Sequence, residues 1–359
     1  MLETLRKRCV LCGFESESIS SSLKVCVRCL RERPVESLEI VRRTRARWRR
    51  SISFPVSPPR GGKRCLLCVN ECEISQNGTG YCRVIKNVDG RLIFLTDNFD
   101  EAYLRYYLDP HPTNCVALPV CPEKDHRGFF NLAVFFAGCN LDCLFCQNID
   151  HKYMIAGGTM RDGERVSVEE LVRVAEQNRV SCVCYFGGDP VPWSIFTLKT
   201  SRKMRKRICW ETNGLMNDSI AKQMASISLE TGGIVKIDWK AFSPSVYEAL
   251  TGVDGERAVE RLKHNVELIA GMDERKEPPL LVVSTLIVPH YIDEFEVFNI
   301  CRFLAQIDEK ITYVLLAFAP QHLMHDLFTT SREQMKKVLE AARSSGLKNV
   351  FVENVWLLS

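Results

Sequence analysis

The sequence has no long apolar run. Its longest candidate, LLVVSTLIV at 280–288, has the length of a β-strand and is followed by Pro289. A helix that crosses a membrane needs about 20 apolar residues. The opening residues, MLETLRKRC, also lack the apolar core of a secretory signal peptide. We therefore expect a cytoplasmic protein that does not act at a membrane.

Acidic residues are scarce near the N-terminus. Residues 1–64 hold 16 Lys and Arg against 6 Asp and Glu, although the net charge of the whole chain is only +4. The basic excess peaks in RRTRARWRR at 42–50, and the segment 34–62 ends in SFPVSPPRGG. Such runs are common in solvated linkers, and they are also the electrostatic footprint of nucleic-acid binding. We predict a basic linker over 34–62 and keep nucleic acid as a candidate partner of this region.

Cysteine, in contrast, is abundant, with 17 in 359 residues. Disulfides belong mainly to secreted proteins, so clustered cysteines in a chain without an export signal are better explained as metal ligands. The first cluster consists of two C-x2-C pairs, which can together complete a tetrahedral four-thiolate zinc shell. The sequence predicts a zinc-ribbon-like module over 1–33, with the ligands Cys9, Cys12, Cys26 and Cys29.

A second cluster opens a Cys-rich lead-in module over 63–110. Its spacing is C-x2-C-x3-C-x9-C, and its members are Cys65, Cys68, Cys72 and Cys82. The segment VIKNVDGRLIFL in this module indicates a β-hairpin that turns at VDG. The spacing fits zinc or a second iron–sulfur cluster, and zinc or a purely structural role is our first interpretation. The roles of Cys115 and Cys121, a looser pair beyond the module, stay open.

From about residue 130 onward, apolar strands alternate with amphipathic helices. Ser167 and Ser331 stand at the expected N-caps of two of these helices, each with Glu or Gln three residues later. This alternation predicts a parallel sheet with helices outside it, either open or closed into a barrel. The expected strands cover 132–137, 182–187, 207–213, 233–240, 280–288, 312–318 and 350–354.

Short polar or glycine-bearing sequences mark the ends of the first five expected strands. In a parallel sheet these ends meet at one edge, where active sites of such folds collect. Five consecutive endings of this kind therefore predict one shared site. They are GCNLDCLFCQN (138–148), GGDP (187–190), ETNG (211–214), DWK (238–240) and VPHYID (288–293).

The first of these motifs holds three cysteines, Cys139, Cys143 and Cys146. A structural zinc site takes four ligands, and a catalytic zinc site with three usually includes His or a carboxylate. Three thiolates on one short loop instead favour a [4Fe–4S] cluster with one iron free of protein ligands. Such an iron can bind a small chelating cofactor, and Phe145 would pack beside the cluster.

A C-x3-C-x2-C motif with an aromatic before its last cysteine, followed by GGDP, resembles the radical S-adenosylmethionine (SAM) superfamily. The resemblance extends over residues 64–359 and is strongest to the pyruvate formate-lyase-activating-enzyme-like branch, in its members with an N-terminal Cys-rich or zinc-ribbon extension. It implies an α/β fold, a partial (β/α)6 TIM-type barrel with small Cys-rich N-terminal modules. The radical SAM core would cover 111–359. The matching segments are CLLC, GTGYC, FFAGCNLDCLFCQN, GGDP, ETNG, KIDWKAF, TLIVPHYID and FVENV.

The resemblance also implies which residues bind the cofactors. The three cysteines of the first motif would hold the [4Fe–4S] cluster, and the amino and carboxylate groups of SAM would chelate its open iron. The GGD segment corresponds to the element that receives the methionine amino group. The residues implied to hold SAM are Gly187, Gly188, Asp189, Glu211, Thr212, Asn213, Asp238, Lys240 and His290.

Two positions depart from the family pattern. Glu211 stands where Asp is commoner, and Trp239 stands where Leu is commoner. For Asp238, Lys240 and His290, an ordinary ion pair at a strand end is the alternative interpretation.

The implied function is that of a radical SAM enzyme, an activating-enzyme-like oxidoreductase. It would cleave SAM reductively at the cluster to give a 5′-deoxyadenosyl radical, and act on a protein, a peptide or another macromolecule. A ferredoxin or flavodoxin would donate the electron. The alternative is a zinc-dependent nucleic-acid-binding protein, with or without RNA-modifying radical chemistry. Substrate and oligomeric state do not follow from the sequence.

Overall fold

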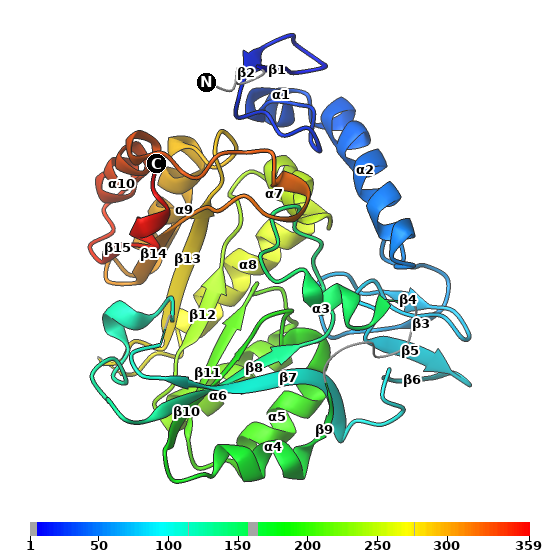
Figure 1. The fold of residues 1–359 in the computed structure, drawn as a ribbon, viewed down its shortest axis with the longest axis vertical. Helices are drawn as coiled ribbons and strands as arrows, with labels where there is room; N and C mark the ends of the chain where they lie inside the picture. The colour runs from blue at the N-terminus through cyan, green and yellow to red at the C-terminus, as the bar shows by residue number, and fades with distance from the viewer. Residues whose placement is uncertain (1–5, 114, 157–163, 276) are drawn as a thin grey trace.

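A computed structural model describes residues 6–113, 115–156, 164–275 and 277–359. Its centre is a nine-stranded sheet with the order β15-β14-β13-β12-β11-β10-β8-β7-β9 (Figure 1). The strands from β8 to β15 along this order pair in parallel, while β7 (Glu101–Pro110) and β9 (Glu164–Ser167) are antiparallel additions at one end. The parallel strands are β8 (Phe130–Phe136), β10 (Val180–Phe186), β11 (Arg207–Thr212), β12 (Val235–Asp238), β13 (Leu281–Ile287), β14 (Thr312–Ala317) and β15 (Val350–Glu353).

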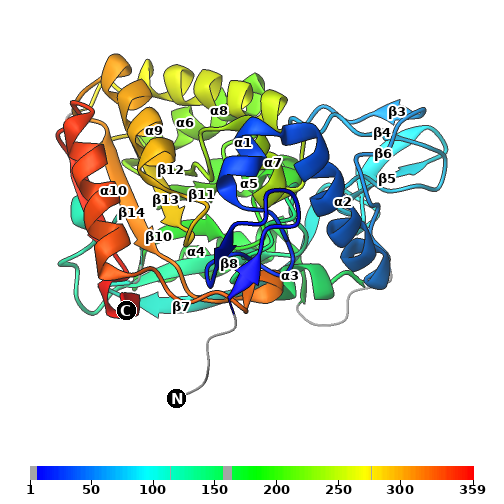
Figure 2. The same cartoon turned by 90° about the horizontal axis from the view of Figure 1, so that it is seen from above.

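Helices connect these strands and cover the outer face of the sheet (Figures 1 and 2). This alternation confirms the predicted α/β class and the barrel-type architecture. All seven expected strands are present within two residues of their predicted bounds. The helices of this region are α3 (Asp150–Tyr153), α4 (Val168–Ala175), α5 (Ser194–Lys203), α6 (Asp218–Thr231), α7 (Pro244–Thr251), α8 (Gly255–Ala270), α9 (Glu294–Ile307) and α10 (Arg332–Ser344).

The helix starts follow from their capping residues. Ser167 Oγ accepts a hydrogen bond from Glu170 N at 3.1 Å, and Ser331 Oγ accepts one from Gln334 N at 3.0 Å. Each cap satisfies a backbone N–H that the first turn of the helix leaves without an internal partner. Both predicted caps are therefore confirmed.

The lead-in module contains two small antiparallel pairs. β3 (Lys63–Arg64) pairs with β4 (Glu73–Ile74), and β5 (Ile85–Val88) pairs with β6 (Arg91–Phe94). The second pair is the hairpin predicted from VIKNVDGRLIFL. Asp89 and Gly90 at its turn have φ of 49° and 74°, as a two-residue turn with left-handed residues requires.

The N-terminal region consists of β1 (Lys7–Arg8), β2 (Glu15–Ser16), α1 (Val27–Glu32) and α2 (Pro34–Ser51). The segment 34–62 differs from the linker expected there. Its first 18 residues, Pro34–Ser51, form helix α2. Pro34 occupies the first turn, where a missing N–H costs nothing. Leu38 and Val41 are buried on one face. The first five residues of the predicted ribbon lie outside the described residues.

Helix α2 runs along one side of the barrel from α1 to the lead-in module (Figure 1). It contacts α7, where Arg45 Nη2 donates to Ala249 O at 3.0 Å. The 34–51 segment is thus a packed part of the structure, and the irregular stretch is confined to 52–62.

Candidate functional site: a three-cysteine cavity at the strand ends

The loop after β8 carries the three-cysteine motif. It begins at Gly138, whose φ of 78° is left-handed. A Cβ at this position would lie 2.6 Å from Val84 Cγ2 and 2.9 Å from Cys82 O, closer than real contacts allow. Glycine therefore lets the chain turn sharply while packed against the lead-in module.

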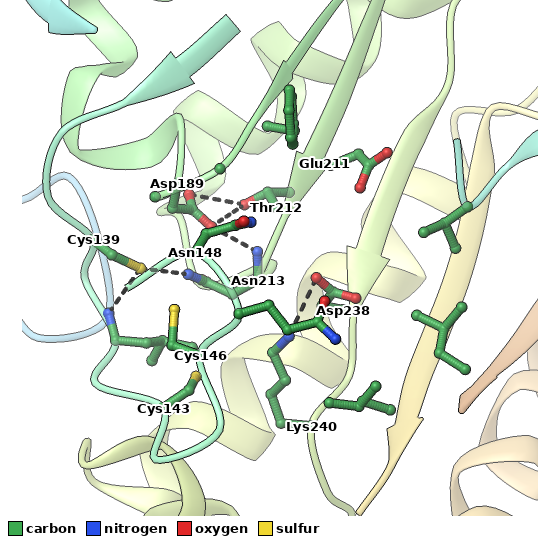
Figure 3. A pocket seen from close by; sticks show the side chains of 18 of the residues that line it. Cys139, Cys143, Cys146, Asn148, Asp189, Glu211, Thr212, Asn213, Asp238 and Lys240 are labelled. Carbon is green, nitrogen blue, oxygen red and sulfur yellow. Dashed lines mark hydrogen bonds and ion pairs between the residues drawn. The ribbon is translucent and has the colours of Figure 1, made fainter. Parts of the chain in front are cut away.

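The thiols of this loop face one cavity of about 270 Å³ at the ends of the parallel strands (Figure 3). Cys139, Cys143, Cys146 and the buried ring of Phe145 all line it. Leu141 N donates to Cys139 Sγ at 3.4 Å. Burial raises the pKa of Cys143 to about 12, so a metal that binds here must displace the thiol proton.

The arrangement of these thiols fits a multi-iron group better than a single metal ion. Among the described residues, only one group of three or more His, Cys, Asp and Glu gathers its ligand atoms closely enough for one ion, and it is the N-terminal quartet. The three sulfurs of the loop are not such a group, yet they share one cavity that is partly walled by Phe145 and Leu141. Soft, separated thiolates around an enclosed space suit an iron–sulfur cluster.

A buried ion network holds the three-cysteine loop in place. Asp142, between the first two cysteines, is 1% exposed and lies 2.9 Å from Lys152 Nζ, 3.2 Å from Arg49 Nη1 and 3.4 Å from Arg45 Nε. Burial alone would raise the pKa of Asp142, but the three cations hold it well below its usual range. Two of the three cations come from α2, so this helix helps to position the loop.

The GGDP motif follows β10 and needs both of its glycines. Gly187 and Gly188 have φ of 64° and 58°. A Cβ on Gly187 would lie 2.1 Å from the ring of Phe135, and one on Gly188 would lie 2.3 Å from Phe136 O. Both glycines line the cavity, where they leave the backbone open to a ligand.

Asp189 also lines the cavity, but its carboxylate is already engaged by the protein. It accepts hydrogen bonds from Asn213 N at 2.8 Å, from Val191 N at 2.9 Å and from Thr212 Oγ1 at 3.2 Å. Burial raises the pKa of Asp189 to about 6, although these hydrogen bonds lower it. The side chain thus ties the end of β10 to the end of β11, in addition to any contact with a ligand.

Asn213 links the strand ends to the cysteine loop. Its Nδ2 donates to Asn140 Oδ1 at 2.7 Å and lies 4.0 Å from Cys139 Sγ. Through its backbone and side chain together, this residue connects Asp189 with the first cysteine of the motif (Figure 3).

A row of alternating charges lines the same cavity; Figure 3 shows three of its members, Glu211, Asp238 and Lys240, and Lys240 Nζ lies 5.9 Å from the centroid of the Phe145 ring. Lys236 Nζ lies 3.3 Å from Glu211 Oε2 and 2.8 Å from Asp238 Oδ1, and Lys240 Nζ lies 3.2 Å from Asp238 Oδ2. Ser284 Oγ donates to Asp238 Oδ1 at 2.7 Å. Burial alone would lower the pKa of Lys236, but the two carboxylates raise it above its usual value.

Lys236 was not among the residues predicted from the sequence. It lies in β12 two residues before Asp238, and residues two apart on a strand share a face. That period was the signal that could have found it. Gln147, Asn148, Glu353 and Asn354 also line the cavity; they lie within the motifs GCNLDCLFCQN and FVENV but were not assigned a role from the sequence.

Cys115 lines the cavity at the end occupied by Glu211, with its Sγ 3.9 Å from Glu211 Oε1. Cys121 is buried and is not among the lining residues. Of the looser cysteine pair, the structure thus brings Cys115 and not Cys121 to the cavity.

The structure does not bring His290 to the cavity. Its Nε2 accepts a hydrogen bond from Val27 N at 3.2 Å, and its ring stacks on Phe14 with 5.8 Å between centroids. His290 has φ of 69°, and this left-handed backbone directs the chain beneath the N-terminal module. The other predicted SAM ligands all line the cavity.

The N-terminal quartet has the spacing of a single-ion site. Cys9 Sγ lies 3.8 Å from Cys29 Sγ, Cys12 Sγ lies 3.7 Å from Cys26 Sγ, and all four sulfurs lie within 4.8 Å of one another. Sulfurs arranged tetrahedrally around zinc at about 2.3 Å are about 3.8 Å apart. The quartet can therefore hold one metal ion.

No helix within the described ranges has the length and apolar character that a membrane span requires.

Comparison with known proteins relates this part of the chain to a family. Residues 133–296 match the Radical SAM superfamily model, and the predicted resemblance is confirmed. A protein of Methanocaldococcus jannaschii is 24% identical over 80% of this chain and 77% of its own length. The probable GTP 3′,8-cyclase of Thermococcus kodakarensis is 23% identical over 53% of this chain and 57% of its own. The pyruvate formate-lyase 1-activating enzyme of Escherichia coli is 26% identical over 40% of this chain and 58% of its own.

Solved structures give a weaker match. SuiB of Streptococcus suis bound to S-adenosylmethionine has a TM-score of 0.44 at 14% identity, covering 61% of this chain and 49% of SuiB. TYW1 with a lysine-pyruvate adduct has a TM-score of 0.41 at 12% identity, covering 66% of this chain and 79% of TYW1.

Proposed function

Because residues 133–296 form a radical SAM domain, we propose that this protein is an enzyme that cleaves S-adenosylmethionine reductively at an iron–sulfur cluster held by Cys139, Cys143 and Cys146. One observation carries the proposal. Three thiols, too widely placed for one ion, share a cavity with the polar ends of the neighbouring parallel strands.

Different residues of the cavity would bind the cluster and SAM. The three thiolates would hold a [4Fe–4S] cluster, and the fourth iron would stay open to the methionine end of SAM. When bound, the cluster and SAM supply a one-electron cleavage of the C5′–S bond that yields the 5′-deoxyadenosyl radical. The protein's own contribution is to bind, orient and exclude water.

Gly187 and Gly188 line the cavity and would offer backbone groups to the SAM amino group. Asp189 keeps that backbone in place through its hydrogen bonds to the end of β11. Lys236 and Lys240 would offer cations to the SAM carboxylate, and Glu211 and Asp238 would offer acceptors to the ribose hydroxyls. The structure supports these roles by placing all of these residues in one cavity.

Anaerobic reconstitution tests the proposal directly. The full chain is loaded with iron and sulfide, reduced with dithionite and mixed with SAM. We expect 5′-deoxyadenosine and methionine by chromatography, and only background from the Cys146→Ala variant. A wild-type protein with a full cluster that forms no 5′-deoxyadenosine would overturn the proposal.

We propose a protein or peptide as the substrate, with a ferredoxin or flavodoxin as the electron donor. The relative from Escherichia coli is named for its action on another enzyme, which supports a macromolecular substrate. The test uses deuterium. Extract from cells grown in deuterated medium is separated into macromolecular and small-molecule fractions, and each is added to the reaction. Deuterium in 5′-deoxyadenosine, found by mass spectrometry, marks the fraction that loses the hydrogen atom.

An RNA substrate is the second candidate, favoured by one surface. Four exposed arginines of α2 line a shallow groove on its outer side: Arg42, Arg43, Arg47 and Arg50. Nuclease or protease treatment of the deuterated macromolecular fraction separates the two candidates. Loss of deuterium transfer after protease alone supports a protein, and loss after ribonuclease alone supports RNA. For both candidate substrates we propose that the N-terminal quartet binds zinc. The quartet precedes helix α2, which carries the exposed arginines.

A further inference from the structure

The four cysteines of the lead-in module form a second cage. Cys65, Cys68, Cys72 and Cys82 line one small cavity between the β3–β4 pair, the β5–β6 hairpin and the barrel. Cys72 and Cys82 are buried, while Cys65 and Cys68 are half-buried. A Cβ on Gly80 would lie 3.8 Å from both Cys72 Sγ and Cys82 Sγ, so this glycine lies between two walls of the cage.

The cage sulfurs are not gathered as those of a zinc site are. In the described part of the chain, no three of them come close enough together to hold one ion, whereas the N-terminal quartet does. Four thiolates without a nitrogen or oxygen ligand bind either zinc or an iron–sulfur cluster. Zinc at about 2.3 Å from each sulfur needs the sulfurs in contact, and a cluster needs them apart around a shared space.

The surroundings of the cage also suit an iron–sulfur group. Leu67, Asn70, Ile85 and Pro192 line it, and no charged side chain does. Tyr81 N donates to Cys72 Sγ and Val84 N donates to Cys82 Sγ, each at 3.4 Å. An apolar shell with N–H donors to the sulfurs is the environment that sets the potential of iron–sulfur groups.

We infer that Cys65, Cys68, Cys72 and Cys82 hold a second [4Fe–4S] cluster, ligated on all four irons by the protein. Because no iron is left open, this cluster has no place for SAM.

The cage adjoins the three-cysteine cavity. Asn70 Nδ2 donates to Asn140 O at 2.7 Å, and Asn140 directly follows Cys139. Val69 N donates to Leu215 O at 2.9 Å, just beyond the ETNG strand end. If the proposed function holds, this position suits a relay in which a reduced ferredoxin or flavodoxin gives up one electron, which the cage passes on to the SAM-binding site.

Metal analysis of the full chain tests the inference. The triple variant Cys139→Ala, Cys143→Ala, Cys146→Ala removes the first site. After anaerobic reconstitution we expect about eight irons per chain in the wild type and about four in the triple variant, with a reduced-cluster signal in electron paramagnetic resonance (EPR). Adding Cys72→Ala and Cys82→Ala should remove the remaining iron and leave about one zinc per chain in the N-terminal quartet.

The opposite result is equally clear. A wild type with about four irons and about two zincs per chain, and a folded triple variant without iron, would overturn the inference. Because the wild-type stoichiometry already separates these outcomes, the test stands even where a variant fails to fold. It is also independent of SAM cleavage, whose failure would leave the iron count unchanged.

The relay has its own readout. In protein with both clusters, reduced flavodoxin and dithionite should both drive SAM cleavage. The rate with flavodoxin divided by the rate with dithionite should fall by about tenfold or more in Cys72→Ala. The reason is that dithionite is small enough to reduce the first cluster directly, whereas flavodoxin depends on the second cluster. If the ratio is unchanged in a variant that has lost the second cluster, the cage does not relay electrons, although it still binds a cluster.

Discussion

The two four-cysteine regions of this protein begin with the same C-x2-C pair and end differently. In the N-terminal quartet, two such pairs face each other across the β1–β2 pair and the start of α1, and the sulfurs are in contact. In the cage, one pair faces two single cysteines from separate strand connections, and the sulfurs stand apart. Sequence spacing sets which thiols can meet, and the surrounding fold sets how much space remains between them.

Their locations differ as well. The N-terminal module docks on the barrel through Arg31, which lies 2.6 Å from Asp293 and 2.8 Å from Glu296, and through Tyr291 Oη, which donates to Val25 O at 3.0 Å. Neither contact reaches the cavity. The cage, in contrast, bonds directly to the cysteine loop and to the end of β11. We therefore expect mutations in the N-terminal quartet to leave the cage and the cavity intact, and mutations near the cavity to leave the quartet intact.

The largest expected effect is that of Cys143→Ala, because it removes one of only three protein ligands of the first cluster. SAM cleavage should fall to background, while the iron of the cage and the zinc of the quartet stay. Matched measurements are 5′-deoxyadenosine by chromatography and metal content by mass spectrometry. If Cys143→Ala kept all of its iron and lost zinc, the sites would not be independent of one another as we expect.

Asp142→Asn should destabilise the protein strongly, since it leaves Arg45, Arg49 and Lys152 buried without their anion. Breaking a buried ion network costs about 3–5 kcal/mol. The control is Glu39→Gln, which removes an exposed ion pair with Arg43 on the same helix and should cost at most about 1 kcal/mol. Chemical unfolding followed by circular dichroism measures both. Equal effects would mean that α2 does not support the cysteine loop.

Cys12→Ser should release zinc from the N-terminal quartet and loosen only that module. Small zinc modules take much of their folding free energy from the metal, so α1 should lose protection in hydrogen exchange. Iron content and SAM cleavage should persist, because the contacts of the module lie away from the cavity. A simultaneous loss of iron would show that the two regions depend on each other.

The smallest expected effect is on His290. Its resemblance to a SAM-binding element predicts weaker SAM binding in His290→Ala, whereas its contacts predict a looser N-terminal module. We expect an unchanged dissociation constant for SAM and a loss of about 1 kcal/mol from one hydrogen bond to the ribbon. Calorimetric titration and thermal melting distinguish the two. A marked loss of SAM affinity would restore the expectation from sequence.

The parts that could be predicted from sequence are those set by local pattern. The seven parallel strands, the helix caps at Ser167 and Ser331 and the hairpin turn at Asp89 and Gly90 depend on residues close together in the chain. Four of the five strand-end motifs converge on one cavity, as parallel topology predicts, whereas residues 288–293 do not line it. Lys236 could have been added by counting two residues back from Asp238.

The rest depended on contacts between distant segments. The arginine run at 42–50 looks like a solvated linker because its anion, Asp142, lies about a hundred residues away in the chain. Only the fold shows that Arg45 and Arg49 are buried. His290 sits in a sequence that resembles a SAM-binding element, but the docked N-terminal module takes its ring nitrogen. The distance between the cage sulfurs, likewise, is a property of the packing around them.

Three thiolates leave one iron of a cluster open for SAM, whereas four thiolates leave none. An EPR titration of the reduced, fully loaded protein with SAM tests this difference. We expect two cluster signals, of which SAM shifts only the one that is absent from the triple variant Cys139→Ala, Cys143→Ala, Cys146→Ala. A shift in the signal that remains in that variant, or no shift in either signal, would contradict it.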